Sequence, residues 1–159
     1  MQTKQLTLTY SEYDSLQELP AADRALMQRA IEATDTAYAP YSHFHVGAAV
    51  RLSDGTVVIG SNQENIAYPS GLCAERTALF SAAAQHPDQA VAAMAVVGRD
   101  AEGRLVEASP CGACRQVMAE CEARHGRPIE LFCYLQGGKI RRITGVDSLL
   151  PFAFGAELG

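Results

Sequence analysis

The sequence predicts a single α/β domain in which a mixed β-sheet carries helices on both faces. Three observations support this. Helix patterns and strand patterns alternate along the chain, which is typical of layered α/β folds. Residues 43–63 have the pattern of a β-hairpin around Asp54-Gly55. Residues 91–98 form a continuous apolar run, the pattern of a strand covered on both faces.

The elements follow in order. Residues 5–10, "QLTLTY", alternate apolar and polar side chains, and we expect a short strand or an arm. A helix is predicted from Ala21, with apolar residues at helical spacing as far as Pro40. The hairpin at 43–63 follows. Residues 73–86 form an alanine-rich helix that ends before Pro87.

The second half continues the alternation. After the strand at 91–98 comes a helix over 111–126, whose closing Gly126 suits a helix C-terminus. Residues 129–135 are a strand, and the glycines that follow turn the chain into another strand at 140–145. A short helix is expected at 147–150. Repeats and linkers are absent from the sequence, so we expect residues 1–20 to be an extension and 21–159 to be one domain.

Composition restricts the function classes. The chain has 159 residues, 48% hydrophobic and 19% charged, which is typical of a soluble globular protein. Its net charge of −5 disfavours nucleic acid as a partner, and its apolar runs are too short for a membrane partner. The N-terminus lacks the pattern of a secretory signal, so we expect a cytoplasmic location. Five cysteines, an odd number, favour free or metal-bound thiols over a disulfide framework.

The pair Cys111 and Cys114, in "PCGAC", admits three interpretations: a redox dithiol, half of a metal site, or coincidence. Cys73 favours the second, because all three cysteines lie at predicted helix starts, where the helix dipole stabilises thiolates. Three protein ligands leave a fourth position open, as in catalytic zinc sites. Cys121 and Cys133 compete as further ligands, but their apolar surroundings indicate core positions.

Glu75 stands two residues after Cys73. Its carboxylate either favours the dipole of the helix or acts as a general acid and base beside the metal. The order Cys-Ala-Glu followed by Pro-Cys-x-x-Cys is that of zinc-dependent nucleobase deaminases. Arg76, three residues from Cys73, is either a surface ion-pair residue or a hydrogen-bond donor to the ligand sulfurs.

Four segments extend the pattern, and with them the sequence resembles the small homotetrameric cytidine deaminases. The segments are "AYAPYSHFHVGAA" (37–49), "NQENIAYPSGLCAERTAL" (62–79), "SPCGACRQV" (109–117) and "LLPFAFG" (149–155). The resemblance implies a three-layer α/β/α sandwich around a mixed five-stranded sheet. It also implies a homotetramer with active sites at subunit interfaces.

The resemblance also implies residue roles. Cys73, Cys111 and Cys114 would bind one Zn²⁺ per subunit, and Glu75 would shuttle protons. Asn62 and Glu64 would bind the ribose, with Tyr68 near the sugar. The backbone at Ala74 and near Ser109 would meet the polar edge of the base. Phe44 would lie against the base, and Phe154 would reach the site from a neighbouring subunit.

Two residues depart from the family pattern. His45 and Ala156 stand where the family often has proline. Because His45 follows Phe44 directly, we expect it to border the pocket and to affect substrate preference.

The predicted function is hydrolytic deamination of cytidine and deoxycytidine, with release of ammonia. Two alternatives share the zinc chemistry: a deaminase of a cytosine-nucleoside antibiotic, and an RNA cytosine editor. The editor would need a basic groove and stacking aromatic residues, which the composition does not indicate. A purely structural zinc module is a third alternative, and it predicts four zinc ligands.

Overall fold

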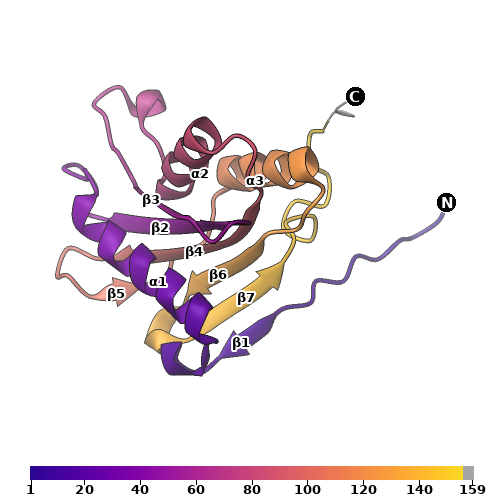
Figure 1. The fold of residues 1–159 in the computed structure, drawn as a ribbon, viewed down its shortest axis with the longest axis horizontal. Coiled ribbons are helices and arrows are strands. Elements are labelled where there is room, and N and C mark those ends of the chain that lie inside the picture. Colours follow the sequence, from indigo (N-terminus) through magenta and orange to yellow (C-terminus); the bar gives the residue numbers. More distant parts are fainter. Residues whose placement is uncertain (156–159) are drawn as a thin grey trace.

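The structure, a computed structural model, describes residues 1–155 as a sheet between two helical layers (Figure 1). Ala156 lies outside the described residues. The strands are β1 (Ser11–Tyr13), β2 (His45–Leu52), β3 (Val57–Ser61), β4 (Val91–Arg99), β5 (Leu105–Val106), β6 (Glu130–Tyr134) and β7 (Ile140–Thr144). The helices are α1 (Ala21–Ala33), α2 (Ala74–Gln85) and α3 (Gly112–His125). Within the described part of the chain, every helix is too short or too polar to cross a membrane.

The sheet has the order β1-β7-β6-β4-β2-β3, and β5 pairs with the free part of β4. It is mixed, since β4 and β6 are parallel and the other neighbours are antiparallel. The expectation of a mixed sheet is therefore confirmed. The sheet has seven strands rather than five, because β1 and β5, with three and two residues, extend it.

Two apolar clusters bind the helices to the sheet, one on each face. Met27 and Ala30 of α1 pack with Phe132 of β6 in one cluster. On the other face, Leu79 of α2 packs with Met118 of α3 and the opposite side chains of β2, β4 and β6. The α/β/α sandwich is therefore confirmed (Figure 1).

The pairing pattern brings the starts of α2 and α3 together. Strand β2 runs antiparallel to both β3 and β4, so β3 and β4 run in the same direction. Helix α2 follows β3, and helix α3 follows the hairpin of β4 and β5. The cysteines at the two helix starts lie together, so both helices begin at the same edge of the sheet. Ligand sites of open α/β sheets commonly form at that edge.

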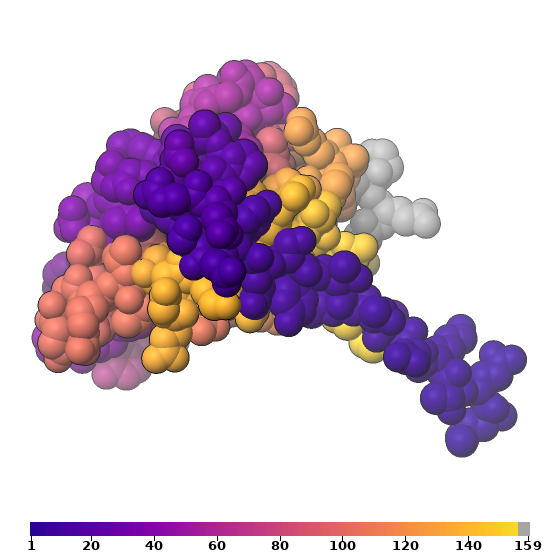
Figure 2. All heavy atoms as spheres, turned by 90° about the horizontal axis from the view of Figure 1, so that it is seen from below, coloured from indigo at the N-terminus to yellow at the C-terminus, as the bar shows by residue number. Residues whose placement is uncertain are grey.

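Of the two expectations for residues 5–10, the arm is confirmed and the strand is not. Residues 1–10 have no regular structure and project away from the body (Figures 1 and 2). The strand is instead β1, which is held on β7 by ion pairs from Arg141 to Glu12 at 2.9 Å and from Lys139 to Asp14 at 2.8 Å. Leu19 is buried in the cluster beneath α1.

Two further elements differ from the expectation. Helix α1 ends at Ala33, and a short 3-10 helix at Thr34–Thr36 replaces its predicted last turns. The hydroxyls of Thr34 and Thr36 donate hydrogen bonds to nearby backbone carbonyls, a pattern that competes with continuing the helix. Residues 147–150 form a turn rather than a helix: the N–H groups of Leu149 and Leu150 both donate to the carbonyl of Val146, and the chain then reaches Pro151, which has no N–H to continue a helix.

Candidate zinc and nucleoside site

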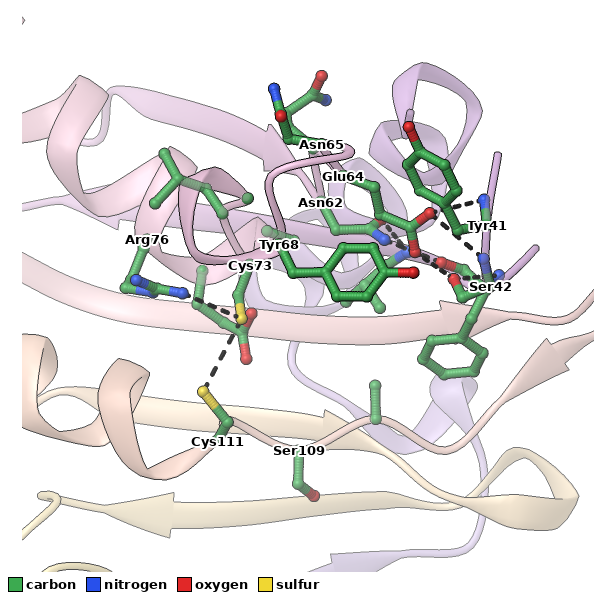
Figure 3. Close-up of a pocket in the computed structure, with 18 of the residues that line it drawn as sticks. Tyr41, Ser42, Asn62, Glu64, Asn65, Tyr68, Cys73, Arg76, Ser109 and Cys111 are labelled. Carbon is green, nitrogen blue, oxygen red and sulfur yellow. Dashed lines mark hydrogen bonds between the residues drawn. The ribbon is translucent and has the colours of Figure 1, made fainter. Parts of the chain in front are cut away.

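Three cysteines meet at the shared helix starts. Cys73 is the N-cap of α2, Cys111 is the N-cap of α3, and Cys114 lies in the first turn of α3. The Sγ atoms of Cys73 and Cys111 are 3.8 Å apart, and those of Cys111 and Cys114 are 3.5 Å apart. Figure 3 shows the sulfurs of Cys73 and Cys111 facing one another across the cavity.

The donor set fits zinc. Tetrahedral ligands with Zn–S bonds of about 2.3 Å place their sulfurs about 3.8 Å apart, and all three Sγ atoms here lie within 4.8 Å of one another. Among the described residues, no other group of this kind occurs, and Cys121 and Cys133 stand outside it. Both are at least partly buried, as expected of core cysteines.

Contact between the thiols shifts their pKa values in opposite directions. A hydrogen bond with Cys114, against the effect of burial and with help from Arg76, lowers the pKa of Cys73 to about 5. The same contact raises the pKa of Cys114, and burial adds to this effect. Because metal ligands are thiolates, a bound cation takes the place of such protons.

Arg76 contacts this cluster. Its Nη2 atom lies 3.5 Å from Cys73 Sγ, as the dashed line in Figure 3 marks. Its position three residues after Cys73 on the same helix brings it over the same face. Of the two interpretations offered above, this contact favours donation to sulfur over a surface ion pair.

Glu75 is nearly inaccessible to solvent, with 4% of its surface exposed, yet it lines the cavity beside Cys73. Burial raises the pKa of its carboxyl, and the negative charge of Cys73 adds to this effect. A carboxyl with a raised pKa is suited to receive and return a proton near neutral pH.

The cavity next to the thiols has a volume of about 830 Å³. Five of the six residues expected to bind substrate line it: Phe44, Asn62, Glu64, Tyr68 and Ala74. Phe154, the sixth, does not. Its side chain is 87% exposed, and its carbonyl accepts a hydrogen bond from Gln116 of α3 at 2.6 Å.

Phe44 enters the cavity just before β2. Its ring lies over Gly98 of β4, where an added Cβ would come within 2.8 Å of the ring. His45 is not among the cavity-lining residues, contrary to the expectation that it borders the pocket. The reason is the strand alternation, since Phe44 and Val46 point into the cavity and the residue between them points away.

The side-chain amide of Asn62 forms two hydrogen bonds with backbone groups. Its Nδ2 donates to the carbonyl of Phe44 at 2.9 Å, and its Oδ1 accepts from the N–H of Val46 at 2.7 Å. One donor and one lone pair of the amide remain for a ligand. Asn62 therefore fixes the start of β2 as well as facing the cavity.

Glu64 holds the loop before Phe44. Its Oε2 accepts from the N–H groups of Tyr41 and Ser42, at 2.9 and 3.3 Å, and its Oε1 accepts from the hydroxyl of Ser42. These contacts, the Ser42 hydroxyl first, lower the pKa of Glu64. Figure 3 shows them at the end of the cavity away from Cys111.

Sequence reasoning gave no role to several cavity residues, among them Tyr41, Ser42 and Glu107. Tyr41 and Ser42 belong to a loop without periodicity, so only the resemblance to "APYSHF" drew attention to their segment. Tyr41 packs edge-on against Tyr68, with ring centres 6.1 Å apart. Glu107 also lines the cavity, and nothing in its local sequence pattern indicates a site.

Comparison with known proteins agrees with this site. Residues 20–126 match the family model described as the cytidine and deoxycytidylate deaminase zinc-binding region. A cytidine deaminase of Halalkalibacterium halodurans is 47% identical over 135 residues, covering 83% of this chain and 93% of the relative. That of Sporosarcina psychrophila is 45% identical over 135 residues, covering 83% and 90%.

Solved structures lead to the same group. The crystal structure of cytidine deaminase from Burkholderia pseudomallei has a TM-score of 0.69 and 45% identity, covering 82% of this chain and 97% of that one. The enzyme from Mycobacterium tuberculosis has a TM-score of 0.65 and 34% identity, covering 83% and 96%. With the family model, the relatives and the structures in agreement, this chain belongs to the cytidine deaminase family.

Proposed function

We propose that this chain is a zinc-dependent cytidine deaminase, which hydrolyses cytidine and deoxycytidine to uridine and deoxyuridine and releases ammonia. One observation carries the proposal: three thiols at the spacing of a tetrahedral metal site lie beside a buried glutamate in a cavity of about 830 Å³. The family match agrees with this chemistry. The antibiotic-deaminase and RNA-editor alternatives gain no support from the matches.

The metal and the glutamate have separate tasks. Zinc bound by Cys73, Cys111 and Cys114 supplies Lewis acidity, which makes a water nucleophilic near neutral pH. Glu75 accepts a proton from the attacking water and delivers it to N3 of the pyrimidine. It then takes the second proton of that water, from the hydroxyl now bonded to C4, and delivers it to the amine, which leaves as ammonia when the C4–N bond breaks. One carboxylate beside the reaction centre can reach each of these atoms in turn.

Three thiolates give the zinc centre a net charge of −1, which opposes its role as a Lewis acid. The N-termini of α2 and α3 offset this charge, because their dipoles place positive ends at the ligands. The guanidinium of Arg76 contributes a full positive charge at 3.5 Å from Cys73 Sγ. Both effects withdraw negative charge from the sulfurs.

The residues assigned to the sugar have hydrogen-bonding positions left for one sugar hydroxyl. Glu64 already accepts three hydrogen bonds, so of its roughly four lone-pair positions about one stays free. Asn62 offers one further donor. A single sugar hydroxyl can donate to Glu64 and accept from Asn62, which supports the use of both cytidine and deoxycytidine.

The charge of the cavity favours a nucleoside over a nucleotide. Three glutamates line it: Glu64, Glu75 and Glu107. Arg76 is the cation among the lining residues, and it is directed at Cys73. A phosphate group would meet like charge at Glu64 and Glu107, which is unfavourable where few ions screen the cavity.

Two expectations extend the proposal to the whole assembly. Apolar side chains that are largely exposed in the single chain, including Ile66, Tyr68 and Phe154, favour burial against other copies, in line with a homotetramer. We assign Phe154 to the site of a neighbouring subunit. Five free cysteines are consistent with a reducing compartment and hence with a cytoplasmic location.

The test is an assay of the zinc-loaded chain with three substrates: cytidine, deoxycytidine and cytidine monophosphate. We expect loss of cytidine absorbance and release of ammonia with both nucleosides, and a strongly reduced rate with the nucleotide. Zinc content measured on the same sample links the activity to the metal. A zinc-loaded, folded protein that releases no ammonia from either nucleoside would contradict the proposal.

A further inference from the structure

We propose that Ser42 is a positioning residue of the substrate site, whose hydroxyl couples the carboxylate that faces the sugar to the backbone of the phenylalanine that faces the base. The inference rests on the proposed function and goes beyond it, because it assigns a task to a residue in the loop before β2. The two groups that Ser42 joins are Glu64 and Phe44.

The hydrogen-bond directions follow from chemistry. The Glu64 carboxylate only accepts, so the Ser42 hydroxyl donates its one hydrogen to Oε1. The hydroxyl oxygen of Ser42 in turn accepts from the N–H of Phe44 at 3.1 Å. Glu64 Oε2 binds the N–H groups of Tyr41 and Ser42 in addition. The loop is thus wrapped around the Glu64 carboxylate (Figure 3).

Phe44 is held from both sides of its backbone. Its N–H donates to Ser42, and its carbonyl accepts from Asn62 Nδ2 at 2.9 Å. Asn62 and Glu64, the two residues assigned to the sugar, are therefore each connected to the residue assigned to the base. A displacement of the residues that bind the sugar therefore also displaces Phe44, which faces the base.

The loop conformation has a cost that these bonds offset. His43, between Ser42 and Phe44, has φ +55°, and in the described part of the chain no other residue except glycine has a positive φ. Residues other than glycine rarely adopt this left-handed backbone conformation. The turn at His43 directs the Phe44 N–H back to the Ser42 hydroxyl, so the bond and the strained residue depend on each other.

Loss of the hydroxyl has a specific consequence. Without it, the Phe44 N–H loses its partner, and Glu64 keeps only the two backbone donors. Cys73, Glu75 and Cys111 stay on their helices, away from the loop. Substrate binding therefore weakens while the chemical step is retained, so KM for cytidine rises about tenfold, the effect of one charge-assisted hydrogen bond, with kcat within about twofold.

The experiment compares Ser42→Ala, Ser42→Thr and the control Ser53→Ala. Ser53 forms an exposed hydrogen bond with Gln89 outside the cavity. Steady-state kinetics with cytidine give KM and kcat, and amide hydrogen exchange of Phe44 is measured without substrate. We expect a raised KM and faster exchange for Ser42→Ala, recovery of both values in Ser42→Thr, and wild-type values for the control.

The outcomes separate the two proposals. Deamination by the wild type tests the proposed function, whereas Phe44 exchange tests the Ser42 contact without any turnover. Unchanged exchange and unchanged KM in Ser42→Ala overturn the inference, and so does a fall in kcat at constant KM. If Ser42→Ala does not fold, Ser42→Cys takes its place, since a thiol of similar size is a weak donor.

Discussion

At the scale of single residues, the site combines two groups whose pKa values are shifted in opposite directions. Cys73 has a lowered pKa, with Cys114 as the main cause and Arg76 contributing. Glu75, two residues away, has a raised pKa because it is buried. The same helix start thus stabilises an anionic ligand and a carboxyl that can carry a proton. Such opposed shifts in neighbouring groups are typical of acid–base sites.

Glu75→Ala removes the proton carrier while leaving the thiols in place. We expect kcat for cytidine to fall at least about a hundredfold, the contribution of general acid–base catalysis, with zinc content unchanged. Glu75→Gln, which keeps the shape of the side chain, should be equally impaired. Zinc analysis and the ammonia assay on one preparation measure both properties. Near-normal turnover in either variant would contradict the assigned role.

Arg76→Ala removes the donor that contacts Cys73. Removal of a group that hydrogen-bonds to a metal ligand typically lowers metal affinity by about 10- to 100-fold, so we expect the zinc affinity of Arg76→Ala to fall by about tenfold or more. Competition with a chelator measures the change. Arg76→Lys keeps a positive charge without the planar guanidinium, and its zinc affinity should lie between those of the wild type and Arg76→Ala. Unchanged affinity and turnover in Arg76→Ala would reject the contact as functional.

At the scale of elements, two glycines set how closely the helices approach the sheet. A Cβ on Gly60 of β3 would lie 2.4 Å from the backbone N of Ala78 in α2. A Cβ on Gly47 of β2 would lie 2.0 Å from the carbonyl oxygen of Ala30 in α1. The first contact fixes the helix that carries Cys73, and the second fixes the helix on the opposite face.

Gly60→Ala and Gly47→Ala form a matched pair. Each should destabilise the fold by about 1–3 kcal/mol, because backbone has to move to admit the methyl group. Only Gly60→Ala displaces the start of α2, so only this variant should also lose zinc affinity. Denaturant unfolding and chelator competition measure the two effects. Equal zinc affinity in both variants would show that α2 adapts without moving Cys73.

The strand pair β6–β7 makes stability depend on pH. Although burial acts to raise it, hydrogen bonds from Arg142 and Thr144 lower the pKa of Glu130 below its ordinary 4.5. The unfolded chain therefore binds a proton more readily, and this stabilisation is present above pH 4.5 and lost as the pH falls through the lower, folded value. Glu130→Gln should flatten the loss of stability in that range.

Unfolding in denaturant at several pH values between about 6 and 3 measures how steeply the free energy of unfolding falls with pH. Glu120→Gln, at an exposed position on α3, is the control, since Glu120 forms no ion pair within the described residues. A slope in Glu130→Gln as steep as in the wild type would contradict the assignment.

How far the sequence predicts these elements depends on the range of the interactions. Helices α2 and α3 and strands β4, β6 and β7 follow from local apolar patterns and turn residues. The short strands β1 and β5 have too few residues for a pattern and exist through pairing with β7 and β4. Similarly, the cysteine spacing indicates the metal site, whereas Ser42 acquires its contacts only when the loop folds onto Glu64.

At the scale of the whole molecule, a set of aromatic and aliphatic side chains is left exposed by the part of the chain that the structure describes. Phe152 and Phe154 are 90% and 87% exposed, and Ile66 and Tyr68 are 82% and 76% exposed. Tyr68 lines the cavity itself. Large exposed apolar groups favour association, and we propose that association uses the surface at which the cavity opens.

Mixing two inactive variants tests this connection. If Phe154 completes the site of a neighbour, a Phe154→Ala chain keeps its own Glu75 and receives Phe154 from a Glu75→Ala chain. Refolding the two variants together should then restore activity, to about a quarter of the wild type under random assembly, because half of the sites carry Glu75 and half of their neighbours supply Phe154. The ammonia assay measures the recovery, and light scattering measures the mass of the assembly.

Each variant refolded alone is the control, and both should stay largely inactive. If Phe154 instead acted within its own chain, no chain in the mixture would carry both Phe154 and Glu75, so mixing could not restore activity. A monomeric mass, or an inactive mixture of correctly assembled chains, would therefore contradict the assignment of Phe154 to the site of a neighbouring subunit. Recovered activity would show that the substrate cavity is completed only by assembly, since the exposed Phe154 side chain does not line the cavity of its own chain.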